Sequence, residues 1–159
     1  MASFKVFPIP NSVARRIRDT RLDDLGHHLH VSAATKNENG PCRSCLKVFV
    51  PGERRILFSY APNQCDHPYN EMGPIYIHEQ RCHPYTDHSS FPPELRTRRP
   101  MTLRCYAAHG TMIGAELVGL AAGRPVEEAI ETLFEQSEIK YLHARTASVG
   151  CFIPRVERV

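Results

Sequence analysis

The pattern of apolar and polar positions predicts a series of short strands along the chain. Runs rich in β-branched and aromatic residues, bounded by turn-forming residues, predict strands at 4–8, 46–50, 54–60, 75–79, 101–107, 111–118, 139–144 and 151–156. Pro51-Gly52 separates the second and third of these runs. Residues 46–60 are therefore expected to form a β-hairpin.

One segment carries a strong helical pattern. Val126, Ile130, Leu133 and Phe134 follow the spacing i, i+4, i+7, i+8, which places them on one face of a helix. Pro125 precedes them and suits the first helical position, where its missing N–H costs nothing. This segment is expected to be the one long helix of the chain.

Together these elements predict an α+β fold: an antiparallel or mixed sheet, one long helix in the C-terminal half and long loops. The chain has 159 residues, of which 42% are hydrophobic, enough for one core. We find no internal repeat and no linker. Residues 1–159 are therefore expected to form a single domain, with residues 1–40 as an N-terminal extension packed on a core of residues 41–158.

Composition and charge exclude several function classes. No apolar run approaches 18 residues, and the first ten residues lack the pattern of a secretory signal, so we expect a cytoplasmic protein without a membrane span. The formal charge of +3 is too small to indicate nucleic-acid binding by itself. The basic stretch with Arg96, Arg98 and Arg99 lacks interleaved aromatic residues, which argues further against nucleic acid.

The cysteine and histidine content points to a metal site. The chain contains six cysteines and nine histidines, and thiols stay reduced in the cytosol, which disfavours disulfides. Cys42 and Cys45 form a C-x-x-C motif, whose two sulfurs can face one ion. No second C-x-x-C exists, and the nearest complement is His78 with Cys82. These four residues would form a Cys₃His site, a known structural zinc type.

Two other interpretations of the C-x-x-C motif remain open. Cys42 and Cys45 could form a thiol–disulfide pair, although the βαβ context of thioredoxin-like proteins is missing. They could also be two ordinary half-buried thiols beside the hairpin, the simplest interpretation of the motif.

A second group of candidate residues lies in the loop before the strand at 75–79. Glu71 and His78 would form an acid–base pair if the loop folds back on the strand. Tyr69 and Asn70 are candidates for contacts with a substrate, because functional side chains often lie on loops held by strands. The alternative is a structural loop with rigid proline turns, in which Tyr69 packs at the edge of the core.

A third group lies at 142–152. His143 and Arg145 differ by two positions, so on a strand they share a face. Arg145 offers a forked donor for a carboxylate or a phosphate. Cys151 is a candidate nucleophile with His143 as its base. The alternative has His143 and Arg145 on the solvent face of a sheet and Cys151 in the core.

Five of these segments together resemble an uncharacterised bacterial domain-of-unknown-function family. They are PCRSCL (41–46), LFSYAP (57–62), PYNEMGPIYIHEQRC (68–82), LRCYAAHG (103–110) and KYLHARTASVGCF (140–152). The resemblance implies a small soluble bacterial protein and supplies no catalytic residue. The chain departs from the family pattern at Asn63, where an aromatic residue is usual, and Pro154 lies inside the final C-F-x-x-R-V-E-R element, where proline fits only an edge strand or a bulge.

Three functions remain open at this point. The first is a small binding or regulatory module with a structural zinc held by Cys42, Cys45, His78 and Cys82. The second is a small enzyme acting on an anionic small molecule, with His78 or His143 as acid–base, Arg145 as the anion-binding group, and Glu71 or Tyr69 orienting the substrate. Nucleic-acid binding ranks third. The sequence does not decide whether the protein is an enzyme.

Overall fold

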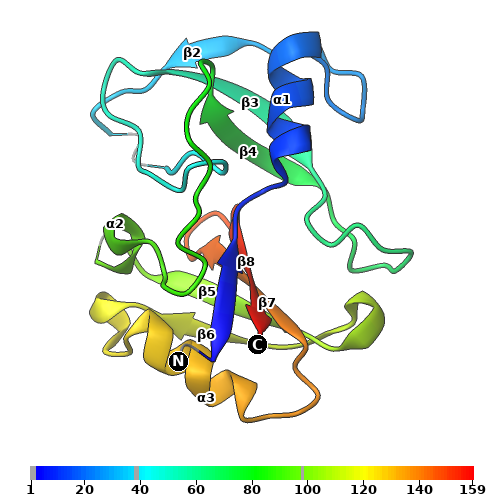
Figure 1. Ribbon diagram of the computed structural model, residues 1–159, viewed down its shortest axis with the longest axis vertical. Coiled ribbons are helices and arrows are strands. Elements are labelled where there is room, and N and C mark those ends of the chain that lie inside the picture. Colours follow the sequence, from blue (N-terminus) through cyan, green and yellow to red (C-terminus); the bar gives the residue numbers. More distant parts are fainter. Residues whose placement is uncertain (1–2, 38–39, 98) are drawn as a thin grey trace.

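Two antiparallel β-sheets form the frame of the protein in a computed structural model that describes residues 3–37, 40–97 and 99–159 (Figure 1). The larger sheet has the spatial order β1-β8-β7-β5-β6. Its strands are β1 (Phe4–Phe7), β5 (Met101–Tyr106), β6 (Met112–Val118), β7 (Tyr141–Thr146) and β8 (Phe152–Arg158). The smaller sheet contains β2 (Val31–Ala33), β3 (Arg54–Tyr60) and β4 (Gly73–His78), in that order.

The helices are short, and the expected α+β fold with one long helix is wrong. The described chain is mostly β, with α1 (Asn11–Thr20), α2 (Pro93–Arg96), α3 (Val126–Phe134) and two 3₁₀ turns, η1 (Ala108–Gly110) and η2 (Leu120–Ala122). The helix expected after Pro125 is α3, which has only nine residues. It ends at Phe134 because its apolar face ends there, and Pro125 lies before the helix at its N-cap.

The hairpin expected at 46–60 is also absent. Residues 54–60 form β3 as expected, but β3 pairs with β2 and β4. Residues 46–50 form no strand; Val48 makes only an isolated bridge with Pro41. Leu46 and Val48 are buried in the core of the larger sheet and Phe49 in that of the smaller sheet, whereas Val50 is exposed.

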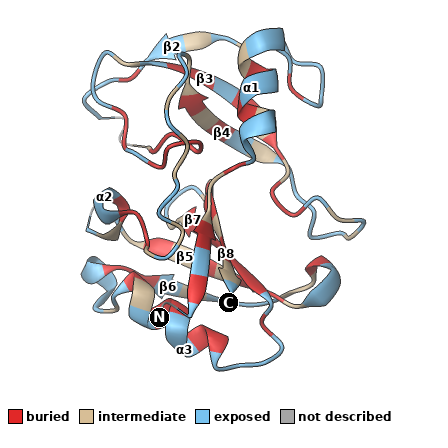
Figure 2. Cartoon of the chain, in the orientation of Figure 1, coloured by how far each residue is buried: buried red, intermediate tan, exposed pale blue. Residues whose placement is uncertain are grey.

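Each sheet has its own hydrophobic core: α2 and α3 contribute to the core of the larger sheet, and α1 to that of the smaller sheet. Ile130 and Leu133 of α3 pack with Leu103 and Leu142 of the larger sheet. Ala14 and Ile17 of α1 belong to the second core, with residues of β3 and β4. Phe152 at the start of β8 also belongs to this second core. The buried positions therefore follow the strands of both sheets (Figure 2).

The first part of the chain contributes to both sheets. β1 pairs with β8 at one edge of the larger sheet, and β2 pairs with β3 at one edge of the smaller sheet. Residues 79–92 run back from the smaller sheet to the larger one (Figure 1). Across the described residues, no helix has the length and apolar character needed to cross a bilayer.

Candidate functional site

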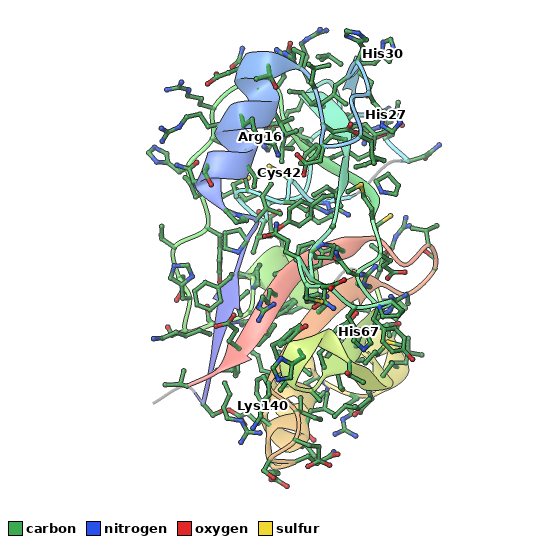
Figure 3. All side chains as sticks on the ribbon, turned by 90° about the vertical axis from the view of Figure 1, so that its right-hand side faces the viewer. Arg16, His27, His30, Cys42, His67 and Lys140 are labelled. Carbon is green, nitrogen blue, oxygen red and sulfur yellow. The ribbon has the colours of Figure 1, made fainter. Side chains whose placement is uncertain are left out.

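The four residues predicted as a metal set come together at the smaller sheet. The candidate ligand atoms of Cys42, Cys45, His78 and Cys82 all lie within 4.8 Å of one another. The Cys42 and Cys82 sulfurs are 3.8 Å apart, and the Cys45 sulfur lies 3.6 Å from Nδ1 of His78. All six cysteines are free. Figure 3 shows Cys42 in the part of the molecule that holds α1 and the smaller sheet.

These separations match a tetrahedral zinc site. Zinc binds thiolate sulfur at about 2.3 Å and imidazole nitrogen at about 2.0–2.1 Å, so tetrahedral geometry separates two sulfurs by about 3.8 Å and a sulfur from a nitrogen by about 3.6 Å. The two distances in the cluster have the same values. The side chains therefore need little movement to surround one ion.

The C-x-x-C segment is folded as a tight loop that brings its two sulfurs together. The Leu46 N–H donates to the Cys42 carbonyl at 2.8 Å, and the Cys42 N–H donates to the Lys47 carbonyl at 2.9 Å. Leu46 adopts a left-handed conformation with φ of 57°, which is uncommon for a residue with a branched side chain. We call residues 42–47 the cysteine loop.

The cysteine loop is hydrogen bonded to segments that are distant in sequence. The Arg43 N–H donates to the Tyr76 carbonyl of β4 at 3.0 Å, and the Arg43 carbonyl accepts from the Ile9 N–H at 3.1 Å. The Ser44 carbonyl accepts from the Tyr85 N–H at 2.9 Å. The loop is thus a junction of the N-terminal segment, the smaller sheet and the chain that returns to the larger sheet.

Two further residues surround the cluster and were not identified from the sequence. Glu53 Oε2 lies 3.1 Å from Nε2 of His78, the nitrogen that faces away from Cys45. Arg18 of α1 donates from Nε to the His78 carbonyl at 3.0 Å, and its Nη2 lies 3.4 Å from the Cys82 sulfur. A carboxylate on the second nitrogen of a histidine is the usual outer contact of a metal-binding imidazole. No sequence spacing links Glu53 or Arg18 to the cysteines.

Proximity shifts the pKa values within the cluster. Hydrogen bonds with Cys42 and Cys82 raise the pKa of His78 to about 10. Hydrogen bonds with Cys42 and Cys45 lower the pKa of the Cys82 thiol, and those with Cys42 and Cys82 raise the pKa of the Cys45 thiol. Opposite pKa shifts of this kind are expected when neighbouring groups titrate as a coupled set and share a limited number of protons.

The second and third candidate groups meet at a different place, between the loop before β4 and the larger sheet. The Glu71 carboxylate forms ion pairs with Arg145 of β7, at 2.9 Å, and with Arg104 of β5. Arg145 Nη1 also donates to the Gly150 carbonyl at 2.9 Å. These residues line a cavity of about 340 Å³. Arg145 thus does bind a carboxylate here, and that carboxylate belongs to the same chain.

His143 lies beneath this cavity, fully buried among aromatic rings. Its ring centroid is 4.6 Å from that of Tyr106, 5.3 Å from Tyr141 and 5.1 Å from Phe152. Neither ring nitrogen has a hydrogen-bond partner in the described part of the chain. Burial, reinforced by neighbouring arginines, lowers the pKa of His143 to about 2, so the ring is neutral at pH 7. Cys151 is half-buried, and no hydrogen bond joins it to His143 among the described residues.

The remaining candidate residues are dispersed. Tyr69 is exposed and stacks on His67, and the Asn70 side chain accepts the Gln64 N–H within the same loop. His78 belongs to the cysteine cluster and Glu71 to the arginine pair, so the structure does not bring these two residues together.

The residues of the basic stretch with Arg96, Arg98 and Arg99 are also dispersed. Arg96 pairs with Glu127 at 2.8 Å, and Arg99 lines a cavity between the two sheets. Arg98 lies outside the described residues.

Comparison with known proteins identifies the family. No curated protein and no solved structure matches the chain. A family model described as a protein of unknown function (DUF1203) matches residues 39–158, which include all four candidate metal ligands. The resemblance seen in the sequence motifs is thereby confirmed at the level of the family: the chain belongs to the DUF1203 family of proteins of unknown function.

Proposed function

We propose that the protein is a small binding module whose fold is held by one Zn²⁺ ion bound by Cys42, Cys45, His78 and Cys82. The observation that carries this proposal is the pair of distances within the cluster. The sulfur–sulfur separation of 3.8 Å and the sulfur–nitrogen separation of 3.6 Å equal two of the edges expected for a tetrahedral S₃N site, and all four ligand atoms lie within 4.8 Å of one another.

The ligand set supports a structural role for this ion. Four protein ligands complete a tetrahedron, whereas a catalytic zinc keeps one position for water or substrate. Cys42 and Cys45 are buried, and His78 and Cys82 are half-buried, so the site is largely closed. The ion would join the cysteine loop to the end of β4 and to the segment that returns to the larger sheet. Binding free energy at such a junction adds directly to the stability of the fold.

Chelation and substitution test the structural role. We expect a strong chelator to lower the melting temperature of the protein, and stoichiometric Zn²⁺ to restore it, because an ion that binds only the folded state stabilises it. Cys42→Ser is expected to have the lower melting temperature and no response to the chelator. Cys65→Ser is the matched control, because Cys65 is a free half-buried thiol outside the cluster. A wild-type melting temperature that is unchanged by zinc removal would refute the structural role.

A further inference from the structure

A cavity of about 820 Å³ lies between the two sheets. Its walls come from both sheets and from the cysteine loop, with Tyr76 on β4, Met101 on β5 and Ile153 on β8 among them. A volume of this size is typical of pockets for small organic ligands. The walls combine apolar side chains with a few polar groups, as such pockets usually do.

Arg43 is the central polar group of this cavity. It lies between the candidate ligands Cys42 and Cys45, and only 3% of its surface is exposed. Its Nε donates to the Phe152 carbonyl at 2.7 Å, and its Nη1 donates to the Pro41 carbonyl at 2.6 Å. Both partners are neutral, and Nη2 donates no hydrogen bond to any described residue. The guanidinium carries its positive charge at pH 7, as arginine side chains in proteins do.

Two further arginines belong to the described lining, and one of them, Arg55, has interaction partners of its own. Arg55 and Arg99 also border the cavity, and the guanidinium of Arg55 lies 4.1 Å from the ring centroid of Tyr76. No aspartate or glutamate occurs among the described lining residues. Thr146 and Ser148 also belong to the lining, and the Thr146 hydroxyl accepts the Cys151 N–H at 2.9 Å. The buried guanidinium of Arg43 has no carboxylate partner among the described residues, and an anionic ligand would supply such a countercharge.

The arginine pair of the smaller cavity provides a contrast. Arg104 and Arg145 share the single carboxylate of Glu71, so one of their two charges is compensated within the chain. Arg43 has no carboxylate partner among the described residues. An incoming anion would have to displace Glu71 from the arginine pair, whereas no carboxylate of the described residues has to be displaced at Arg43.

We propose that the cavity between the sheets binds a small organic anion, with its carboxylate or phosphate group at Arg43 and its apolar part against Tyr76, Met101 and Ile153. The planar guanidinium suits the oxygen atoms of either group. The ligand is thus defined by its chemistry: an oxyanion attached to an apolar body that fits about 820 Å³.

This binding site is linked to the proposed metal centre by the cysteine loop. A metal bound by Cys42 and Cys45 would fix the position of Arg43, which lies between them in sequence. Loss of the metal is therefore expected to weaken anion binding as well. This link alone rests on the proposed function. The anion site itself is defined by Arg43 and the cavity, and Arg43 is not a candidate metal ligand.

A titration followed by ¹H–¹⁵N NMR tests the proposal on the purified full-length protein. The probes are phenyl phosphate and benzoate, with phenol as the neutral analogue and inorganic phosphate as the anion without an apolar part. For ligands of this size we expect dissociation constants of about 1 mM. The shifts should be centred on residues 146–151 and Tyr76. Comparing the two organic anions shows which oxyanion the site prefers, while phenol and inorganic phosphate should bind more weakly.

Variants assign the binding to Arg43. Arg43→Met is expected to weaken binding by about tenfold or more, since a charge-assisted contact is lost. Arg16→Met is the control, because Arg16 is an exposed residue of α1 outside the lining. Zinc content, measured on the same samples, should be unchanged in both variants. Loss of anion binding without loss of metal therefore separates this proposal from the proposed function.

Several results would overturn the proposal. One is that neither organic anion binds, and another is that Arg43→Met binds them with wild-type affinity. A third is that Arg145→Met loses anion binding while Arg43→Met retains it. If Arg43→Met does not fold, Arg99→Met replaces it, because Arg99 is an exposed lining residue whose removal should not disturb the core. Arg99→Met is expected to weaken binding severalfold, and unchanged affinity in that variant would count against the proposal.

Discussion

Glu53 Oε2 lies 3.1 Å from Nε2 of His78, while Nδ1 of the same ring faces the Cys45 sulfur at 3.6 Å. The imidazole is therefore held between a carboxylate and the cysteine cluster. In the proposed metal centre, this arrangement would orient Nδ1 toward the ion and leave the proton on Nε2, where Glu53 would accept it. Glu53 also accepts the Val50 N–H at 2.8 Å, so its carboxylate is fixed by the chain beside the cysteine loop.

Glu53→Gln tests this orientation. The amide keeps the shape of the side chain but loses the charge that favours the Nε2–H tautomer, so we expect zinc affinity to fall by about 10–100-fold. Competition with a chromogenic chelator measures the affinity. Glu79→Gln is the matched control, because Glu79 follows His78 in sequence and pairs with Arg21 and Arg54. Equal affinities in the two variants would show that Glu53 does not position the histidine.

Because His143 is buried, we expect the free energy of unfolding to fall as the pH is lowered. The pKa of His143 is lowered to about 2 by burial, whereas an unfolded histidine titrates near 6.5. Below about pH 6.5 the unfolded chain binds a proton that the folded chain does not, so the stability falls by about 1.4 kcal/mol for each pH unit.

His143→Leu removes this titration. Between about pH 6.5 and 5, the free energy of unfolding of the variant should therefore fall by about 2 kcal/mol less than that of the wild type. Denaturant unfolding at the two pH values measures the difference. His30→Leu, at an exposed position, should keep the wild-type slope. Parallel pH profiles for wild type and His143→Leu would contradict the neutral, buried state of His143.

Asp23 is expected to stabilise the loop that packs on β3. Its buried carboxylate accepts the Leu25, His27 and Ser59 N–H groups at 3.0–3.1 Å. Burial acts to raise the pKa of Asp23, but these bonds and His27 outweigh it and lower the pKa to about 2. The stabilisation is thus complete above about pH 4 and is lost as the pH falls toward 2.

At pH 7, Asp23→Asn should lower the free energy of unfolding by about 2 kcal/mol, because hydrogen bonds to a charged acceptor are lost. The gap between variant and wild type should narrow as the pH falls from 4 toward 2. Chemical denaturation over this range measures it. Asp24→Asn, at the exposed neighbouring carboxylate, is the control and should have little effect. A constant gap across the pH range would show that the charge of Asp23 is not the source of the effect.

Gly110 fixes the contact between η1 and the loop before β4. It has φ of 87°, and a Cβ atom there would overlap the Cys65 sulfur and lie 2.9 Å from Nδ2 of Asn63. Gly110→Ala is therefore expected to lower the free energy of unfolding by about 1–3 kcal/mol. Gly114→Ala is the control, since no atom lies within 4 Å of the added Cβ and its φ is ordinary. Equal stability in the two variants would contradict the packing described for this turn.

The sequence allowed most strands to be predicted but not the sheets they form. Residues 54–60 alternate clearly, and they are β3 as expected. Residues 46–50 have a similar apolar pattern, yet they form no strand. Leu46, Val48 and Phe49 are buried because the cysteine loop and the residues after it pack against the cores. A short apolar pattern does not distinguish a buried loop of this kind from a strand. The apolar positions of α3 end at Phe134, where the helix itself ends, so the pattern supported nine residues and not the long helix that was expected.

The site was predicted where local spacing carried information. The C-x-x-C motif identified Cys42 and Cys45, and the end of the 75–79 strand suggested His78 and Cys82 as their partners. Glu53 and Arg18 reach the cluster only through the pairing of β3 with β4 and the packing of α1, which no local pattern encodes. The sequence indicated both Glu71 and Arg145 as candidate site residues, but their ion pair depends on how the loop folds over the larger sheet.

Metal analysis of protein purified without chelator, from cells grown with zinc, tests the central claim most directly. Elemental analysis should find about one zinc per chain in the wild type and in Cys65→Ser, and little in Cys42→Ser. Substitution by Co²⁺ should give thiolate-to-metal charge-transfer absorption with a tetrahedral d–d spectrum. Wild-type protein that contains no metal, and takes up neither Zn²⁺ nor Co²⁺ when fully reduced, would contradict the proposed metal centre.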